Sequence, residues 1–295
     1  MNLVNIHQPA SFPPPGGLRQ VLTIAGLFIG NLLLFGLIGA GISRLSPFTD
    51  IATLHIIQNI STVGSFLLPA WLFAHLTAPG HAAAYLGCRP VPAVSYAWGL
   101  AAFLALIPWI NALTNWNMEL LRPWPNSGIG LFFKQMSDKN EQLLQLFLNK
   151  TDAGSLCLNL FTLALMPAVC EEFFFRGGLQ RCLSAHARRP QAGIWISAFI
   201  FSLLHLDPVG FLPRLFLGAL LGYVFAASRS LYPGILLHFL NNASVVTAYY
   251  LYGNGLLQRH PESFSGHWHW WSAVPGLCLS IGFIVMLYRQ RIVKP

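Results

Sequence analysis

Long apolar stretches recur along the chain, and they restrict its fold more than any other feature. A helix needs about 20 consecutive, mainly apolar residues to cross the hydrocarbon core of a bilayer. Lipid offers the backbone no hydrogen-bond partners, so such stretches span the membrane as helices whose backbone groups bond to one another. We therefore expect an all-α fold, a polytopic membrane helix bundle with about eight transmembrane helices. The candidate spans cover residues 19–43, 52–75, 93–116, 155–180, 191–206, 211–229, 232–252 and 270–288.

The charge content agrees with lipid as the main solvent of the chain. Only 9% of the 295 residues are charged, whereas a soluble domain carries about 25% charged residues. So few charges cannot cover a water-exposed surface, and membrane lipids are the expected surroundings. The net charge of +8 requires no nucleic-acid partner, because the basic excess falls on loops that can face anionic headgroups.

The apolar stretches divide the chain into a short tail and one membrane domain. Residues 1–18 are a Pro/Gly-rich N-terminal tail that lacks the charged and apolar regions of a signal peptide. Residues 19–295 are expected to form a single membrane domain. Within it, the segment from Gly128 to Lys150 mixes charged and large apolar residues. That mixture is typical of an amphipathic helix that lies at the interface or covers the end of a bundle.

The distribution of Lys and Arg predicts the orientation. With eight spans, the loops on the side of both termini carry nine basic and no acidic residues, whereas the opposite side carries seven of each. Cytoplasmic loops carry an excess of Lys and Arg. We therefore expect a multi-pass protein, in a bacterial cytoplasmic membrane as the short loops suggest, with both termini in the cytoplasm.

Two adjacent acids interrupt the fourth apolar stretch. Glu171 and Glu172 would together cost on the order of 5 kcal/mol at the membrane centre if both were ionised and unpaired. Glu172 and Arg176 are four residues apart, so they share a helix face and can pair. This pair could equally serve only to lock helix packing. Glu171 points about 100° away and has no partner within its own helix, and Pro167 could kink the helix beside it.

Histidines and an amide occur inside two further spans. His205 lies one helical turn after Phe201 in the fifth span, and His238 and Asn242 share a face of the seventh. A single His in an apolar helix is more often a satisfied core residue than a functional one. Buried polar groups in lipid need one another, however, so these residues and Glu171 are expected to converge on one site.

These residues form three motifs that resemble those of a known family. The stretch from Glu171 to Arg176 matches EExxxR, the stretch from Phe201 to His205 matches FxxxH, and the stretch from His238 to Asn242 matches HxxxN. Their order on separate membrane helices resembles the CAAX protease and bacteriocin-processing (CPBP, or Abi) family of intramembrane proteases, similar to type II CAAX prenyl endopeptidases. The resemblance covers roughly residues 155–250, the expected catalytic core. It implies a membrane-embedded peptidase with a cavity open toward the cytoplasm.

The resemblance also implies a role for each residue. Glu171 and His205 would activate water, and His238 and Asn242 would stabilise the oxyanion. Glu172, Arg176 and Phe201 would support the site. The chemistry agrees, because peptide hydrolysis needs a base for water and donors where negative charge develops.

Two His and one Glu are also a set of ligands that zinc accepts with an open coordination position. A metal, if used, would be held by Glu171, His205 and His238, although HExxH is absent. A glutamate-dependent mechanism without a metal needs the same residues, so either no cofactor or zinc is compatible with the sequence.

The predicted function is an intramembrane endopeptidase that hydrolyses a peptide bond with a Glu/His-activated water. Its substrate would be a peptide or a lipidated protein. One alternative is a proton- or ion-coupled transporter, which needs polar groups along most of the membrane thickness. The first three spans and the eighth hold no charged residue in their interiors, which favours a single cluster. A non-catalytic membrane scaffold of the same fold is the other alternative.

Overall fold

The computed structural model describes residues 17–45, 51–121, 128–187, 189–261 and 270–293, and all regular structure in these ranges is helical. Helices labelled η are π-helical. The elements are α1 (Gly17–Leu45), α2 (Ile51–Thr62), η1 (Val63–Leu67), α3 (Leu68–Thr77), α4 (Ala82–Leu86), α5 (Ala93–Leu121), α6 (Gly128–Leu148), α7 (Ala153–Asn159), η2 (Leu160–Leu165), α8 (Met166–Glu172), η3 (Phe173–Gln180), α9 (Arg181–His186), α10 (Pro190–Leu204), α11 (Phe211–Ser228), α12 (Leu231–Gly253) and α13 (Trp270–Val293). The predicted helical bundle is thereby confirmed. Most of the N-terminal tail, residues 1–16, lies outside the described residues.

Within the described residues, six continuous helices are long and apolar enough to cross a membrane: Gly17–Arg44, Ile51–Thr77, Ala93–Leu120, Ala153–His186, Phe211–Ser228 and Ala273–Gln290. The other two expected spans differ from these. Helix α10 has only 15 residues, about 22 Å at 1.5 Å per residue. Helix α12 has 23 residues, which is long enough, but His238, Asn241 and Asn242 lower its hydropathy. Both exceptions carry predicted site residues.

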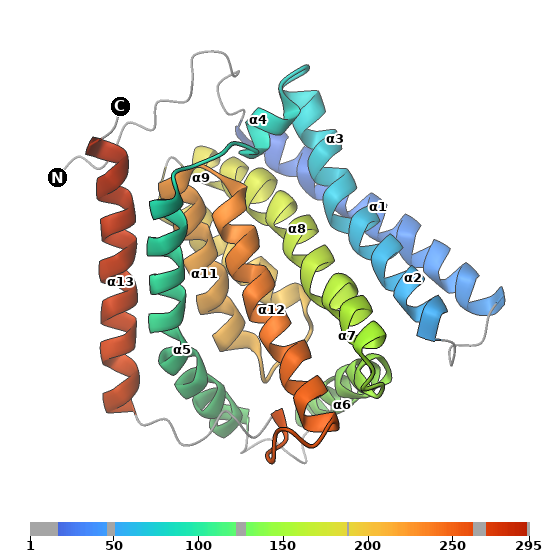
Figure 1. The fold of residues 1–295 in the computed structure, drawn as a ribbon. Coiled ribbons are helices and arrows are strands. Elements are labelled where there is room, and N and C mark those ends of the chain that lie inside the picture. Colours follow the sequence, from blue (N-terminus) through green and yellow to red (C-terminus); the bar gives the residue numbers. More distant parts are fainter. Residues whose placement is uncertain (1–16, 46–50, 122–127, 188, 262–269, 294–295) are drawn as a thin grey trace.

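The long helices form a bundle with two outer groups (Figure 1). Helices α1, α2 and α3 pack together on one side, and α5 packs against α13 on the other. The helix that runs from α7 to α9 lies between these groups, with α12 packed against η2 and α8. Helices α10 and α11 pack on each other and complete the bundle. The start of α1 and the end of α13 lie at one end, here called the terminal end, and α6 lies at the other, the α6 end.

Two apolar clusters flank the region where the motif residues meet. The first joins α1, α3, α4 and η3 and includes Ile24, Phe73 and Phe175. The second joins α5, α11 and α12 and includes Leu221 and Leu237. The outer faces of the long helices expose many large apolar side chains. This is the arrangement expected of a bundle that meets lipid on its outside.

The helix that carries the two acids is not a regular α-helix. π-Helical turns precede and follow α8, and Pro167 stands in the first turn of α8. π-Helical turns are rare and frequently occur at functional sites. Glu171 and Glu172 are 8% and 0% exposed, so both are buried although adjacent residues of a helix point about 100° apart.

The start of α12 is fixed to the loop between α4 and α5. The Leu231 amide donates to the Gly87 carbonyl at 3.0 Å, and the Ser230 hydroxyl donates to the Arg89 carbonyl at 2.7 Å. Gly87 has a φ of 95°, and a Cβ there would lie 3.2 Å from the Arg229 carbonyl oxygen, so this position requires glycine. These bonds fix where α12 enters the bundle and therefore how deep His238 lies.

The predicted amphipathic segment is helical. Helix α6 lies across the end of the bundle opposite the start of α1 (Figure 1). It exposes apolar side chains such as Leu131 and Phe132. The Asn159 amide donates to the Phe147 carbonyl at 2.8 Å. Asn140 reaches the Leu206 carbonyl at the end of α10, with a distance of 3.4 Å. Helix α6 is therefore joined to the elements that surround the site.

Candidate active site

His238 lies between the two adjacent carboxylates. Its Nδ1 is 3.1 Å from Glu172 Oε1, and its Nε2 is 3.8 Å from Glu171 Oε2. The first distance is a hydrogen bond in which Nδ1 donates, because an ionised carboxylate only accepts. The second is too long for a direct hydrogen bond. His238 is 2% exposed, so α8 and α12 meet here through buried, ionisable groups.

Glu172 also contacts Arg176, as their spacing predicts. Arg176 Nε lies 3.2 Å from Glu172 Oε2, and the two side chains are 1% and 0% exposed. The guanidinium also lies over the ring of Phe201, 5.1 Å from its centroid. Glu172 therefore joins a cation on its own helix to a histidine on α12. This ion pair holds in place the carboxylate that accepts the hydrogen bond from His238 Nδ1.

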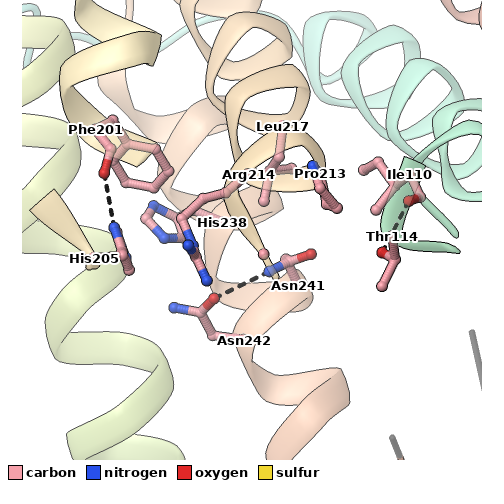
Figure 2. Close-up of a pocket in the computed structure, with 11 residues that line it drawn as sticks. Ile110, Thr114, Phe201, His205, Pro213, Arg214, Leu217, His238, Asn241 and Asn242 are labelled. Carbon is pink, nitrogen blue, oxygen red and sulfur yellow. Dashed lines mark hydrogen bonds between the residues drawn. The ribbon is translucent and has the colours of Figure 1, made fainter. Parts of the chain in front are cut away.

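His205 reaches the site from the end of α10. Its Nδ1 is 2.7 Å from the Phe201 carbonyl oxygen (Figure 2). A carbonyl only accepts, so Nδ1 carries the proton and the neutral ring keeps a lone pair on Nε2. The Phe201 ring lies edge-on to His205 at 4.8 Å and edge-on to His238 at 5.7 Å between centroids. Phe201 therefore packs against both histidines.

From the sequence, we expect Glu171 to lie within hydrogen-bond reach of His205, directly or through one water, and the direct bond is not formed. Across the described ranges, the structure gives Glu171 no hydrogen bond to His205, and its histidine partner is His238. Glu171 Oε2 is buried and makes no hydrogen bond. Glu171 is thus a carboxylate with an unused acceptor atom beside the His238 imidazole.

Asn242 is oriented by a neighbour that sequence reasoning missed. The Asn241 amide nitrogen donates to Asn242 Oδ1 at 3.1 Å (Figure 2), and the Ser244 hydroxyl donates to the Asn241 backbone carbonyl at 2.6 Å. The bond occupies the Asn242 oxygen and leaves its Nδ2 donors available. The signal in the sequence is the pair of adjacent asparagines, of which only the second falls in the HxxxN pattern.

A cavity of about 180 Å³ joins several of these groups (Figure 2). This volume is below the roughly 300–1,000 Å³ of pockets that enclose a drug-sized ligand, so it suits a short segment of a larger substrate. The lining residues come from α5, α10, α11, α12 and the turn before α11. They are Ile110, Thr114, Phe201, His205, Gly210, Pro213, Arg214, Leu217, His238, Asn241 and Asn242.

The cavity lies nearer the α6 end than the terminal end. It is lined by the second half of α5, the end of α10 and the first turns of α11, and α10 begins beside α9 at the terminal end. The sequence leads to two expectations, cytoplasmic termini and a cavity open toward the cytoplasm. The cavity therefore lies toward the opposite end from the start of α1 and the end of α13, and if it opens at that end, the two expectations require opposite orientations of the bundle.

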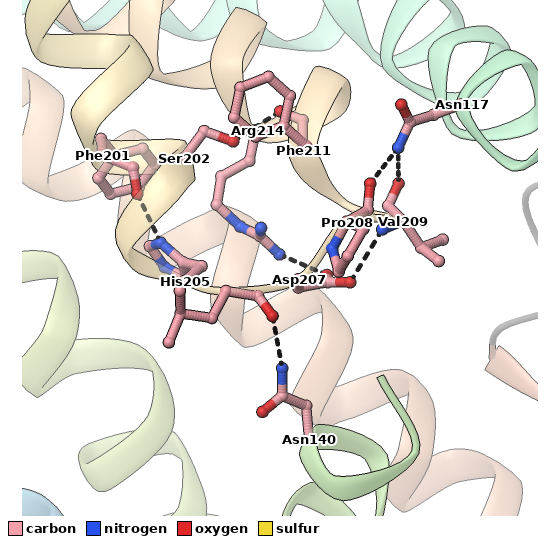
Figure 3. A network of polar contacts seen from close by, with 11 residues as sticks. Asn117, Asn140, Phe201, Ser202, His205, Asp207, Pro208, Val209, Phe211 and Arg214 are labelled. Atoms are coloured by element: carbon pink, nitrogen blue, oxygen red, sulfur yellow. Dashed lines mark hydrogen bonds and ion pairs between the residues drawn. The ribbon is translucent and has the colours of Figure 1, made fainter. Parts of the chain in front are cut away.

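A second feature missed from the sequence is an ion pair at this cavity. Arg214 Nη2 lies 2.9 Å from Asp207 Oδ2, and Asp207 Oδ1 accepts the Val209 amide at 3.1 Å (Figure 3). The Asn117 side chain donates to the carbonyls of Pro208 and Val209. From the sequence, Arg214 counts only as a loop charge, and Asp207 is a turn residue whose nearness to His205 leaves a supporting role open. Their pairing is not predicted, since no spacing rule connects a turn with the helix after it.

The residues that could hold zinc do not form a metal site. Among the described residues, no group of three or more His, Cys, Asp or Glu side chains is arranged to bind a metal ion. The Nδ1 atoms of His205 and His238 donate to a carbonyl and to a carboxylate, so only their Nε2 atoms could be metal ligands. As placed in the described residues, these atoms and Glu171 are not grouped to hold one metal ion.

The fold and the site together define a polytopic helical membrane protein with an ionisable cluster inside its bundle. Residues 153–244 match the family model described as Rce1-like, type II CAAX prenyl endopeptidase Rce1-like. This segment contains all three motifs, and the match confirms their resemblance to the CAAX protease (CPBP) family. At the level of the family, it supports a CAAX-type intramembrane protease. Searches of curated proteins and of solved structures found no significant match.

Proposed function

We propose that the protein is an intramembrane endopeptidase that hydrolyses a peptide bond with water activated by Glu171 and His205. The observation that carries the proposal is the position of His238, held between the carboxylates of Glu171 and Glu172 at the edge of a partly open cavity. A purely structural ion pair would need only Glu172 and Arg176. Glu171 adds a buried acceptor that the packing of the bundle does not use.

Two atoms are suited to take the proton of the attacking water. Glu171 Oε2 is buried and makes no hydrogen bond, and His205 Nε2 keeps its lone pair because Nδ1 donates to a carbonyl. A base within hydrogen-bond reach of the water accepts its proton as the oxygen attacks the scissile carbonyl carbon. The same group then returns the proton to the leaving amine when the carbon–nitrogen bond breaks.

The carbonyl oxygen becomes an oxyanion during this attack, and the site supplies donors for it. The Asn242 amide nitrogen is available because Asn241 occupies the amide oxygen. His238 can donate from Nε2 when its ring is protonated, and Glu172 accepts from Nδ1. Donors placed where charge develops are commonly the largest single contribution to catalysis. Arg176 would act indirectly, because it holds Glu172 in place.

The substrate is proposed to be a peptide segment or a lipidated protein that enters from the membrane. Exposed apolar side chains cover the outer faces of the helices that surround the site, and the cavity itself is small. A chain that arrives from the lipid would place only a short segment at the histidines. No step of this proposal passes through a metal ion.

The test uses purified protein in liposomes and a library of quenched fluorescent peptides and lipopeptides. Wild-type protein should cleave some members, and Glu171→Gln should abolish that cleavage while the protein remains folded in the membrane. Glu141→Gln is the matched control, because Glu141 lies on α6 outside the site and undergoes the same chemical change. Cleavage by the Glu171→Gln protein at the wild-type rate would refute the proposal. Ion flux that depends on Glu171, without cleavage, would instead identify a transporter.

A further inference from the structure

Arg181 is a partly buried cation at the terminal end of the bundle, away from the candidate active site. It is the first residue of α9, and its guanidinium carbon lies 5.3 Å from the ring centroid of Tyr85 and 5.6 Å from that of Phe225. The two rings belong to α4 and α11, so the guanidinium is held between three helices. Aromatic rings contact the face of a guanidinium, and the N–H donors at its edge stay available to a ligand.

Two more arginines lie within electrostatic range of Arg181. They are Arg89, in the loop between α4 and α5, and Arg229, directly after α11. Arg89 donates from Nε to the Arg229 carbonyl at 2.9 Å and from Nη2 to the Ser228 carbonyl at 3.1 Å. These bonds cap the carboxyl end of α11, which explains the position of Arg89. Burial and the nearby charge of Arg229 lower the pKa of Arg89 from its ordinary value, so like charges oppose one another here.

The acidic residues of the sequence lie elsewhere. None of the nine Asp and Glu residues falls within residues 78–95, 180–195 or 226–235, which contain the three arginines and their neighbours along the chain. Across the described part of the chain, the structure gives Arg181 no ion pair with a carboxylate. A group of like charges destabilises the compact state through repulsion. An anion from outside the chain would relieve this repulsion.

These arginines stand at the depth of the lipid headgroups. The helix that contains Arg181, Ala153–His186, has 34 residues, which is about 51 Å at 1.5 Å per residue. The hydrocarbon core is only about 30 Å thick, so the ends of this helix reach the headgroup region. Arg229 directly follows the span Phe211–Ser228. Basic pockets between helices at this level are typical sites for the phosphates of anionic lipids.

An apolar helix face leads from this level into the bilayer. Helix α12 begins beside Arg89, because the Ser230 hydroxyl donates to the Arg89 carbonyl at 2.7 Å. Tyr232 and Leu236 follow on one face of α12, four residues apart, and are 40% and 37% exposed. The acyl chain of a lipid can lie against such a face, whereas a free phosphate would use the arginines alone. The arrangement therefore favours a phospholipid as the source of the phosphate.

We propose that Arg89 and Arg181 bind the phosphate of an anionic phospholipid at the terminal end of the bundle, where α4, α9 and the start of α12 lie (Figure 1). The charge of Arg229 adds to the positive field. Guanidinium groups bind phosphate through two parallel hydrogen bonds. The bound lipid would link the helix that carries Glu171 to the turn before α12, the helix that carries His238. The site does not depend on the proposed peptidase function.

Native mass spectrometry of the purified full chain tests the proposal. The probes are phosphatidylglycerol and phosphatidylcholine with identical acyl chains, because the choline group brings a cation of its own. Wild-type protein should bind one phosphatidylglycerol roughly 10-fold more tightly than phosphatidylcholine. Arg181→Gln should remove this preference. Arg181→Lys should keep part of it, because lysine retains the charge without the two-bond geometry.

Arg289→Gln is the matched control. Arg289 is exposed near the end of α13, at the same end of the bundle, and undergoes the same chemical change. This variant should keep the preference for phosphatidylglycerol. Equal losses in Arg181→Gln and Arg289→Gln would overturn the proposal, because the preference would then come from the net charge of the whole end. A wild-type protein that binds both lipids alike would overturn it as well.

Competition with inorganic phosphate separates the two sources of the anion. Phosphate at millimolar concentration, with the ionic strength held constant to keep screening equal, should leave phosphatidylglycerol bound. Displacement of the lipid would assign the arginines to a free phosphate and overturn the lipid proposal.

Thermal unfolding in mixed micelles supplies a second measurement and reports folding. At about 100 times its Kd, phosphatidylglycerol should raise the Tm of the wild type and of Arg289→Gln by roughly 5 °C relative to phosphatidylcholine. Arg181→Gln should unfold cooperatively without this rise. A wild-type Tm that is the same in both lipids would contradict the proposal without relying on any variant. Neither measurement involves cleavage, so this proposal and the proposed peptidase function can fail independently.

Discussion

The ion pair between Glu172 and Arg176 leads to a quantitative prediction for Arg176→Met. Methionine fills much of the space of the arginine stem, so the main change is the loss of one charge. The partners are 0% and 1% exposed and their atoms lie 3.2 Å apart. Removing one partner of a buried pair costs about 3–5 kcal/mol. The hydrogen bond from His238 Nδ1, at 3.1 Å, remains and compensates part of the stranded charge on Glu172. We therefore expect a loss near the lower end, about 3 kcal/mol.

The assay is reversible unfolding of the purified protein in mixed micelles. The double variant Glu172→Gln/Arg176→Met removes both charges. Its unfolding free energy should return to within about 1 kcal/mol of the wild-type value, because a buried ion pair contributes little net stability over neutral groups. A stable Arg176→Met single variant would refute this reasoning. A double variant as unstable as the single one would do the same, since it would show that packing, and not an unpaired charge, causes the loss.

Three further predictions concern the amide pair, helix packing and orientation. Asn242→Ala should lower kcat roughly 100-fold or more if this residue is an oxyanion donor. Asn241→Ala should lower kcat less, and single-turnover rates measure the difference between the two variants. Gly193→Ala should lower the unfolding free energy by about 1–3 kcal/mol in micelles, because its Cβ would lie 2.5 and 2.7 Å from backbone atoms of α9. Cysteines at His186 and Asp138 should react with an impermeant reagent from opposite sides of the membrane. Reaction of both from one side would contradict the placement of the terminal end and the α6 end on opposite sides of the membrane.

Chelator treatment tests the proposed independence from metal. Residues Glu171, His205 and His238 do not form a metal-binding group in the described part of the chain. Cleavage should therefore continue at its original rate after prolonged incubation with a strong chelator. Activity that is lost and then returns with added zinc would show that these side chains rearrange around a metal.

Features within one helix could be predicted from the sequence. The spacing of Glu172 and Arg176 identifies their ion pair, and the mixed pattern from Gly128 to Lys150 identifies α6. The lengths of the apolar stretches identify the bundle, because the membrane requires a minimum span. Each of these predictions follows from the helical repeat or from the thickness of the bilayer.

Contacts between helices were harder to predict. The sequence places Glu171 and two histidines in three spans, but which histidine meets Glu171 depends on how each helix is rotated. The π-helical turns on both sides of α8 change that rotation, and no residue pattern revealed them. Arg214 was missed for a related reason, since its partner lies in a turn whose shape is fixed by Asn117 on another helix.

The π-helical segment after the two acids has a consequence for insertions and deletions. A π-helical turn holds more residues than an α-helical one, so a single deletion within Phe173–Gln180 could be absorbed by a return to the α-helix. The helix would stay continuous, and the residues beyond the deletion would rotate much less than the roughly 100° that one lost residue produces in a regular α-helix. Gly177 and Gly178, which allow Leu86 and Ile24 to approach closely, would therefore stay near them. A deletion within Met166–Glu172 has no extra residue to give up, so it would turn the acids away from the packing of the rest of the helix.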